Sequence, residues 1–153
     1  MTAVYEQSDV RFMYPENWEL DNREDSSRPW SVSVHSPGGA FWSITVYDEQ
    51  TDLEWLRKET LQAVHGEFEE SYFESDEVIE EIAGQPSEGY NMHFYYLDFL
   101  VAAKLRSFRL RQHSCVILYQ AEDRDFDQLE RVFQAITHSL FRPEMELSKD
   151  AAL

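Results

Sequence analysis

The sequence contains a single cysteine, Cys115, among its 153 residues. An intramolecular disulfide is therefore excluded, which suits a reducing compartment. No run of about 18 apolar residues occurs, so we expect no transmembrane helix and no membrane insertion. The first residues, MTAVYEQSDVRF, carry neither the basic nor the apolar region of a secretory signal. Together these absences predict a cytoplasmic protein.

Positive charge is also scarce, with 13 Lys and Arg against 30 Asp and Glu and a formal net charge of −17. Such a charge opposes binding to phosphate backbones and to anionic lipid surfaces, so we expect no nucleic-acid partner. The acidity suits solubility and repulsion between copies, or a docking surface for a basic partner. We expect a monomer or a weak homodimer with a protein partner of unknown identity.

The common catalytic motifs are missing as well, since no GxSxG, GxGxxG or P-loop pattern occurs. Asp123, Asp125 and Asp127 resemble the opening of a calcium loop, but the sixth and twelfth positions hold Gln128 and Gln134 instead of glycine and glutamate. The five histidines show no metal-ligand spacing. A nucleophilic Cys115 beside His113 is disfavoured, because an expected turn would separate them, and a packed core thiol is favoured. We therefore predict no catalytic residue, no metal site and no cofactor.

Apolar and aromatic residues are plentiful, at 42% and 14% of the chain. This content and length predict one globular domain over residues 1–153. Its core is expected at about 10–141, with mobile termini at 1–8 and 143–153.

Alternating patterns predict several antiparallel strands. Trp30–Val34 and Ala40–Asp48 alternate on either side of the turn sequence SPGG at 36–39, which predicts a hairpin. Val10–Tyr14 predicts a short strand that Pro15 ends. The acid-rich stretch 67–81 predicts a strand near a sheet edge, and Gly84–Ser87 a turn. The run from Gly89 to Ala121 predicts two or three long central strands, the first of which ends near Asp98.

Two helices are predicted. Thr51 and Glu54 match a capping box, so the first helix is expected to begin near Asp52. A second apolar stripe at helical spacing predicts a helix that lies on the sheet, formed by Phe126, Leu129, Phe133, Ile136 and Leu140. The fold class is therefore α+β, with a central antiparallel sheet of about six or seven strands flanked by two main helices in an α/β/α sandwich.

Four of the 13 cations fall within eight residues, and they are the candidate site: Lys104, Arg106, Arg109 and Arg111. The apolar alternation slips once in this stretch, and a β-bulge near Ser107 would place all four on one face. Cross-strand pairing with the acidic Glu74–Glu81 strand is the favoured interpretation. The alternative is a surface for an anion or an acidic partner.

The pattern Phe12-x-Tyr14-Pro15-x-x-Trp18, followed by a hairpin, a helix, four strands and a helix after Tyr119-x-Ala121, resembles the PsbP-like superfamily with its Mog and DcrB relatives. The resemblance spans roughly residues 10–141. It implies a central antiparallel sheet with helices on both sides. It also implies binding rather than catalysis: members include an extrinsic photosystem II subunit, Ran-binding proteins and bacterial chaperones of secreted effectors.

The main hypothesis is a non-catalytic cytoplasmic protein-binding or adaptor module of bacterial type. A chaperone for apolar segments of a secreted effector is a narrower version, and it requires an exposed apolar groove. The alternative is a small-ligand-binding or enzymatic domain with a pocket between sheet and helix, lined by aromatics such as Trp42, Tyr95 and Tyr119.

Overall fold

The computed structural model describes residues 1–7, 10–22, 29–48, 50–67 and 72–142. Within them, a seven-stranded antiparallel sheet has the order β3-β4-β5-β9-β8-β7-β6. Its strands are β3 (Glu19–Asn22), β4 (Trp30–His35), β5 (Phe41–Asp48), β6 (Phe73–Ile82), β7 (Gln85–Tyr96), β8 (Phe99–Leu110) and β9 (His113–Glu122). The helices are α1 (Leu53–Glu67) and α2 (Asp123–Ser139). The predicted fold class is confirmed, including the hairpin of β4 and β5 and the edge position of β6.

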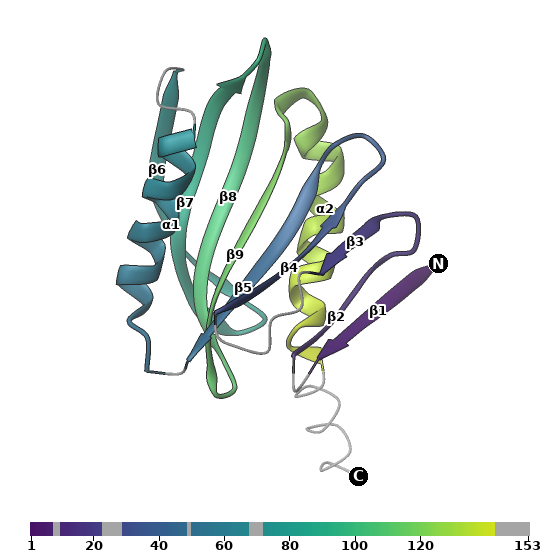
Figure 1. Cartoon of the computed structure of the whole chain (residues 1–153), viewed down its shortest axis with the longest axis vertical. Helices are drawn as coiled ribbons and strands as arrows, with labels where there is room; N and C mark the ends of the chain where they lie inside the picture. Colours follow the sequence, from purple (N-terminus) through teal and green to yellow (C-terminus); the bar gives the residue numbers. More distant parts are fainter. Residues whose placement is uncertain (8–9, 23–28, 49, 68–71, 143–153) are drawn as a thin grey trace.

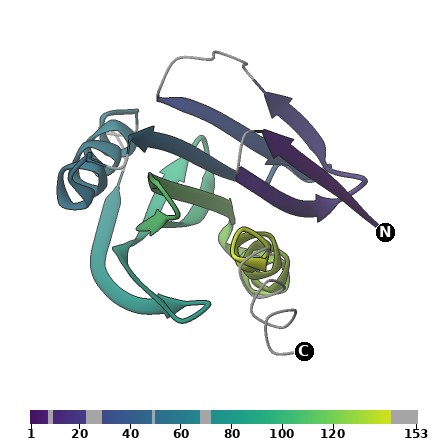
Figure 2. The ribbon, with the colours of Figure 1, turned by 90° about the horizontal axis from the view of Figure 1, so that it is seen from below.

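Each helix covers a different face of the sheet (Figure 2). One core lies between the sheet and α2, where Trp42, Ile117 and Phe133 are completely or almost completely buried. The other lies between the sheet and α1, where Met92, Phe94 and Leu105 are fully buried. Because both faces of the central strands are covered, these strands need apolar residues on both sides. This explains why the run from Gly89 to Ala121 is so rich in them.

The phase slip in β8 does not come from a bulge. β8 pairs with β7 and β9 in uninterrupted register through Ser107, which faces Glu88 on one side and Val116 on the other. Leu105 packs in the α1-side core, whereas Phe108 and Leu110 pack in the α2-side core. The apparent slip therefore reflects two buried faces, and the expected bulge is wrong.

The first residues form a strand, not a mobile terminus. β1 (Thr2–Gln7) pairs antiparallel with β2 (Val10–Pro15) in a separate two-stranded sheet. Tyr5 is buried and its ring stacks on Phe12 at 5.1 Å between centroids. The expectation of mobility at 1–8 is wrong for residues 2–7, while residue 8 and residues 143–153 lie outside the described part of the chain.

Two local predictions also need correction. The α1 cap is Asp52, whose Oδ1 accepts from the backbone N–H of Glu54 at 2.8 Å, while the Glu54 carboxylate binds Lys58 Nζ at 2.9 Å instead of returning to Thr51. The turn expected at Gly84–Ser87 lies earlier in the chain, because β7 already begins at Gln85. Ala83 and Gly84 make this turn, with φ of 51° and 79°.

Candidate functional site

Large apolar side chains gather at the end of the β7–β8 hairpin, which projects furthest at the top of Figure 1. Their exposed fractions are 42% for Tyr95, 55% for Tyr96, 76% for Leu97 and 50% for Phe99. Tyr72, just before β6, joins them at 56% exposed, with its ring 6.2 Å from that of Tyr95. We call these five residues the apolar tip.

The backbone explains how the tip is presented. Tyr96 and Phe99 are register partners, so Leu97 and Asp98 form a two-residue connection between β7 and β8. Tight connections of this kind demand a positive φ, which Leu97 adopts at 55°. Glycine or asparagine is the usual choice there, because a larger side chain crowds the following carbonyl. The leucine side chain is thus directed into solvent at a strained position.

One edge of the tip is tied down by polar contacts. The Tyr72 hydroxyl donates to Glu74 Oε2, and this bond raises the pKa of Tyr72 above its ordinary value. The backbone N–H of Tyr95 donates to the carbonyl of Tyr72 at 3.4 Å. Tyr72 is therefore held against β7.

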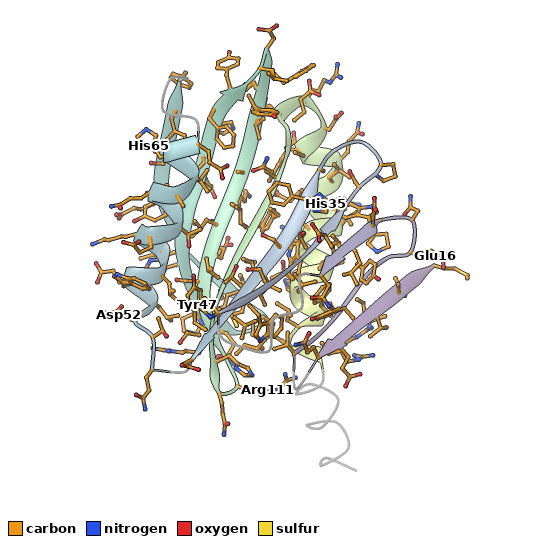
Figure 3. The ribbon with its side chains drawn as sticks, viewed as in Figure 1. Glu16, His35, Tyr47, Asp52, His65 and Arg111 are labelled. Atoms are coloured by element: carbon orange, nitrogen blue, oxygen red, sulfur yellow. The ribbon has the colours of Figure 1, made fainter. Side chains whose placement is uncertain are left out.

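The four predicted site cations are not brought together. Lys104 and Arg106 face α2, whereas Arg109 lies on the opposite face of β8 and donates to the carbonyl of Thr51 at 3.0 Å. Arg111 occupies the β8–β9 turn with a φ of 52°, at the bottom of the sheet in Figure 3. The expected common face is wrong, because it depended on the bulge that β8 lacks.

Arg106 is the most buried of the four, at 1% exposed. Its guanidinium donates to Glu80 Oε1 at 2.6 Å, to Asn91 Oδ1 at 2.8 Å and to the carbonyls of Tyr90 and Leu105 at 3.1 and 2.9 Å. A buried charge needs such compensation, and these bonds occupy the fork of the side chain. Arg106 therefore holds β6, β7 and β8 together.

Lys104 lies at the edge of a small polar pocket of about 170 Å³ between the sheet and α2. Its Nζ is 2.6 Å from Glu130 Oε2 and 5.5 Å from the centre of the Phe126 ring. Tyr119, which also lines the pocket, is 5% exposed, and burial raises the pKa of its hydroxyl well above the ordinary value. Two further polar groups of the lining have partners outside it: Glu80 pairs with Arg106, and the Thr137 hydroxyl accepts from Trp42 Nε1.

The pocket expected from Trp42, Tyr95 and Tyr119 is not assembled. Trp42 and Tyr119 are neighbours on β5 and β9, and Trp42 is fully buried with its Nε1 donating to Thr137 Oγ1 at 2.9 Å. Tyr95 belongs to the apolar tip, on a different part of the sheet. Cys115 is fully buried, as expected for a core thiol. Across the described ranges, no cluster of three or more His, Cys, Asp or Glu side chains is arranged to hold a metal ion.

Sequence reasoning missed the apolar tip, although a signal was present. The stretch Tyr95-Tyr96-Leu97-Asp98-Phe99-Leu100 passes through a turn without glycine, asparagine or proline. Such a turn is costly, so an apolar residue there indicates a role outside the fold.

Comparison with solved structures finds proteins with a similar architecture. The solution structure of cyanobacterial PsbP (CyanoP) from Synechocystis sp. PCC 6803 superimposes with a TM-score of 0.65 at 12% identity, over 90% of each chain. The chain has a PsbP-like fold. The crystal structure of PA94 from Pseudomonas aeruginosa, a protein of unknown function described as a putative regulator, gives a TM-score of 0.50 at 12% identity over 91% of this chain and 95% of that one.

These likenesses concern the fold alone. No protein-family model and no curated protein sequence matches the chain. The structural match confirms the fold that the resemblance implied, a central antiparallel sheet with helices on both sides. In the part of the chain that the structure describes, no helix is long and apolar enough to span a membrane.

Proposed function

We propose that the chain is a non-catalytic, cytoplasmic protein-binding or adaptor module of bacterial type, which docks through the apolar tip. The observation that carries the proposal is the exposure of Tyr95, Tyr96, Leu97 and Phe99 on one projecting hairpin. Clustered exposed apolar residues are typical of interaction sites, and tyrosine is among the residues that contribute most to binding energy.

The conformation of Leu97 supports this role. A non-glycine residue in the left-handed region costs about 1–2 kcal/mol, and asparagine reduces that cost through its short polar side chain. A leucine that is 76% exposed recovers little of this cost through burial within the chain. Its apolar contact is therefore proposed to form with a partner.

Charge suggests the kind of partner. The net charge is −17, and the tip carries Asp98 at its turn and Glu74 beside Tyr72. A protein with an apolar pocket surrounded by basic side chains would complement both features. A chaperone for apolar segments of a secreted effector is a narrower version, in which the tip would contact the effector.

The test uses a substitution that should improve the fold while weakening binding. Leu97→Asn is expected to raise the free energy of unfolding by about 0.5–1 kcal/mol and to abolish partner binding. Arg111→Asn is the matched control, because Arg111 also has a positive φ in a two-residue turn. It should be stabilised similarly and should still bind.

Binding is measured in the native cell with a photoreactive phenylalanine analogue at position 96, and with the same analogue at the exposed Trp55 of α1 for comparison. The proposal expects a discrete crosslinked species from position 96 only, lost in Leu97→Asn and kept in Arg111→Asn. Equal crosslinking from both positions, or full crosslinking in Leu97→Asn, would contradict it.

A small-ligand-binding domain is the second candidate, favoured by the 170 Å³ pocket with its buried Tyr119 hydroxyl. Its expected signature is a metabolite that copurifies with the chain and is lost on Tyr119→Phe. An enzyme would additionally require convergent polar groups that are not already paired with one another.

A further inference from the structure

An apolar groove of about 350 Å³ lies between the β1–β2 hairpin and the C-terminal half of α2. Its walls come from two elements far apart in the sequence: Met13, Tyr14 and Pro15 of β2, and Val132, Ala135 and Ile136 of α2. A cavity of this volume is in the range that accepts small organic molecules. It lies on a different part of the molecule from the apolar tip, so it is independent of the proposed function.

Polar contacts set the separation of the two walls. The backbone N–H of Met13 donates to Ser139 Oγ at 2.8 Å, and Ser139 Oγ donates to the carbonyl of Ile136 at 2.6 Å. Trp18, just after β2, packs edge-on against Phe133 of α2 at 6.0 Å between ring centres. The hairpin and the segment just after it are thus both attached to α2, and the groove is part of the folded architecture.

The charge around the groove is opposite to that of the chain. The residues that line it include two charged side chains, Arg131 and Arg142, and no acid, in a chain with 30 acids and 13 lysines and arginines. These arginines bracket the α2 wall in sequence. Arg142 Nη1 donates to Met13 Sδ at 3.1 Å, which is a weak acceptor. Among the described residues, no hydrogen bond or ion pair engages Arg131.

We propose that the groove binds a single-chain anionic amphiphile, with its alkyl chain against Val132, Ala135 and Ile136 and its carboxylate paired with Arg131 or Arg142. The apolar wall of the groove favours an alkyl chain, because binding buries its methylene groups. A guanidinium next to that channel selects a carboxylate head, to which it can donate two parallel hydrogen bonds. A neutral or cationic head would leave this donor fork without a partner.

In the first test, decanoate is titrated into the protein below its micelle concentration. NMR monitors the methyl signals of protein labelled at its methionines. Met13 lines the groove, whereas Met92 is fully buried in the α1-side core and serves as an internal control. Saturable movement of the Met13 signal with an unchanged Met92 signal is expected. Octanoate should bind about fifteenfold more weakly, because it lacks two methylenes and each contributes roughly fourfold. No saturable shift at Met13, or an equal shift at Met92, would overturn the proposal.

The head group is tested with variants. Arg131→Gln combined with Arg142→Gln should weaken decanoate about tenfold and should leave decanol binding unchanged. Arg124→Gln, on the first turn of α2 and 3.0 Å from Glu122, is the matched control and should bind decanoate normally. Ala135→Phe should fill the groove and remove binding of both ligands while the melting temperature is kept. Equal affinities for decanoate and decyltrimethylammonium, or normal binding by Ala135→Phe, would refute the site.

Discussion

Gly89 lies opposite Arg106 in the β7–β8 pair, and this pairing allows the Arg106 side chain to cross β7 and reach Glu80 on β6. A Cβ at Gly89 would lie 1.7 Å from the carbonyl oxygen of Leu105 and 3.0 Å from the Cα of Arg106. The two strands therefore approach more closely here than any side chain permits. This approach brings the guanidinium over β7, where it also binds Asn91 and the carbonyl of Tyr90.

Gly89→Ala is expected to lower the free energy of unfolding by about 3 kcal/mol or more, because the clash is with backbone atoms that cannot move without breaking the strand pair. Gly66→Ala is the control: it lies in α1, and its added Cβ would meet nothing within 4 Å. There the same substitution should stabilise the protein by about 0.5–1 kcal/mol. Urea denaturation measures both, and similar midpoints for the two variants would contradict the close approach at Gly89.

Glu80→Gln is expected to destabilise the protein by about 2–3 kcal/mol, because it leaves the Arg106 charge buried without its carboxylate partner. The Glu80 side chain is 41% exposed, so solvent reduces the effect relative to a fully buried pair. Glu54→Gln provides the comparison, since Glu54 and Lys58 form an exposed pair on α1. Its unfolding midpoint should stay close to that of the wild type. Equal effects of the two changes would show that Arg106 does not depend on Glu80.

Thr137→Val should cost about 1–3 kcal/mol, because it keeps the side-chain shape but leaves the buried Trp42 Nε1 without an acceptor. Thr60→Val is the matched control. Thr60 also donates to the carbonyl four residues earlier in a helix, as Thr137 does, but its hydroxyl accepts no bond from a buried indole in the described structure. Thermal and urea unfolding of both variants would separate the loss of the Trp42 hydrogen bond from the effect of replacing threonine by valine in a helix. Equal losses of stability in the two variants would argue against a contribution from the Trp42 bond.

The buried hydroxyl of Tyr119 leads us to expect that folding stability falls with pH in the alkaline range. Burial raises the pKa of Tyr119 in the folded state, whereas the unfolded chain ionises near the ordinary tyrosine value of about 10. Above that pH the unfolded state binds fewer protons than the folded state, so stability falls by up to about 1.4 kcal/mol per pH unit from this group. Below about pH 10, Tyr119 is neutral in both the folded and the unfolded state, so its ionisation costs no stability.

Tyr119→Phe should therefore lose less stability than the wild type between pH 9 and pH 11. Urea midpoints at several pH values would show the difference. Tyr72→Phe is the comparison, because Tyr72 is 56% exposed and its raised pKa comes first from the hydrogen bond to Glu74 rather than from burial. Parallel curves for Tyr119→Phe and the wild type would count against the buried hydroxyl.

Much of the fold could be predicted from local patterns. The alternation in Trp30–Val34 and Ala40–Asp48 specified a hairpin, and the spacing of Phe126, Phe133 and Ile136 specified α2. The phase slip in β8 could not be interpreted from the sequence, because alternation alone cannot separate a bulge from a strand with two buried faces. The polar residues at the start of the chain gave no pattern that predicted β1. Its one buried side chain, Tyr5, packs against Phe12 and Trp30, and the sequence alone does not show these contacts.

The site depended on positions that the sequence does not specify by itself. By its own pattern, the chain determined an α+β class, an acidic surface, a core thiol and the approximate places of its turns. The tertiary structure alone decided that the four clustered cations would separate, because the register of β8 sends Arg106 and Arg109 to opposite faces. It also decided that Met13 and Ala135 would face each other across a groove, because such contacts arise between elements more than 100 residues apart that meet only when both pack on the same sheet.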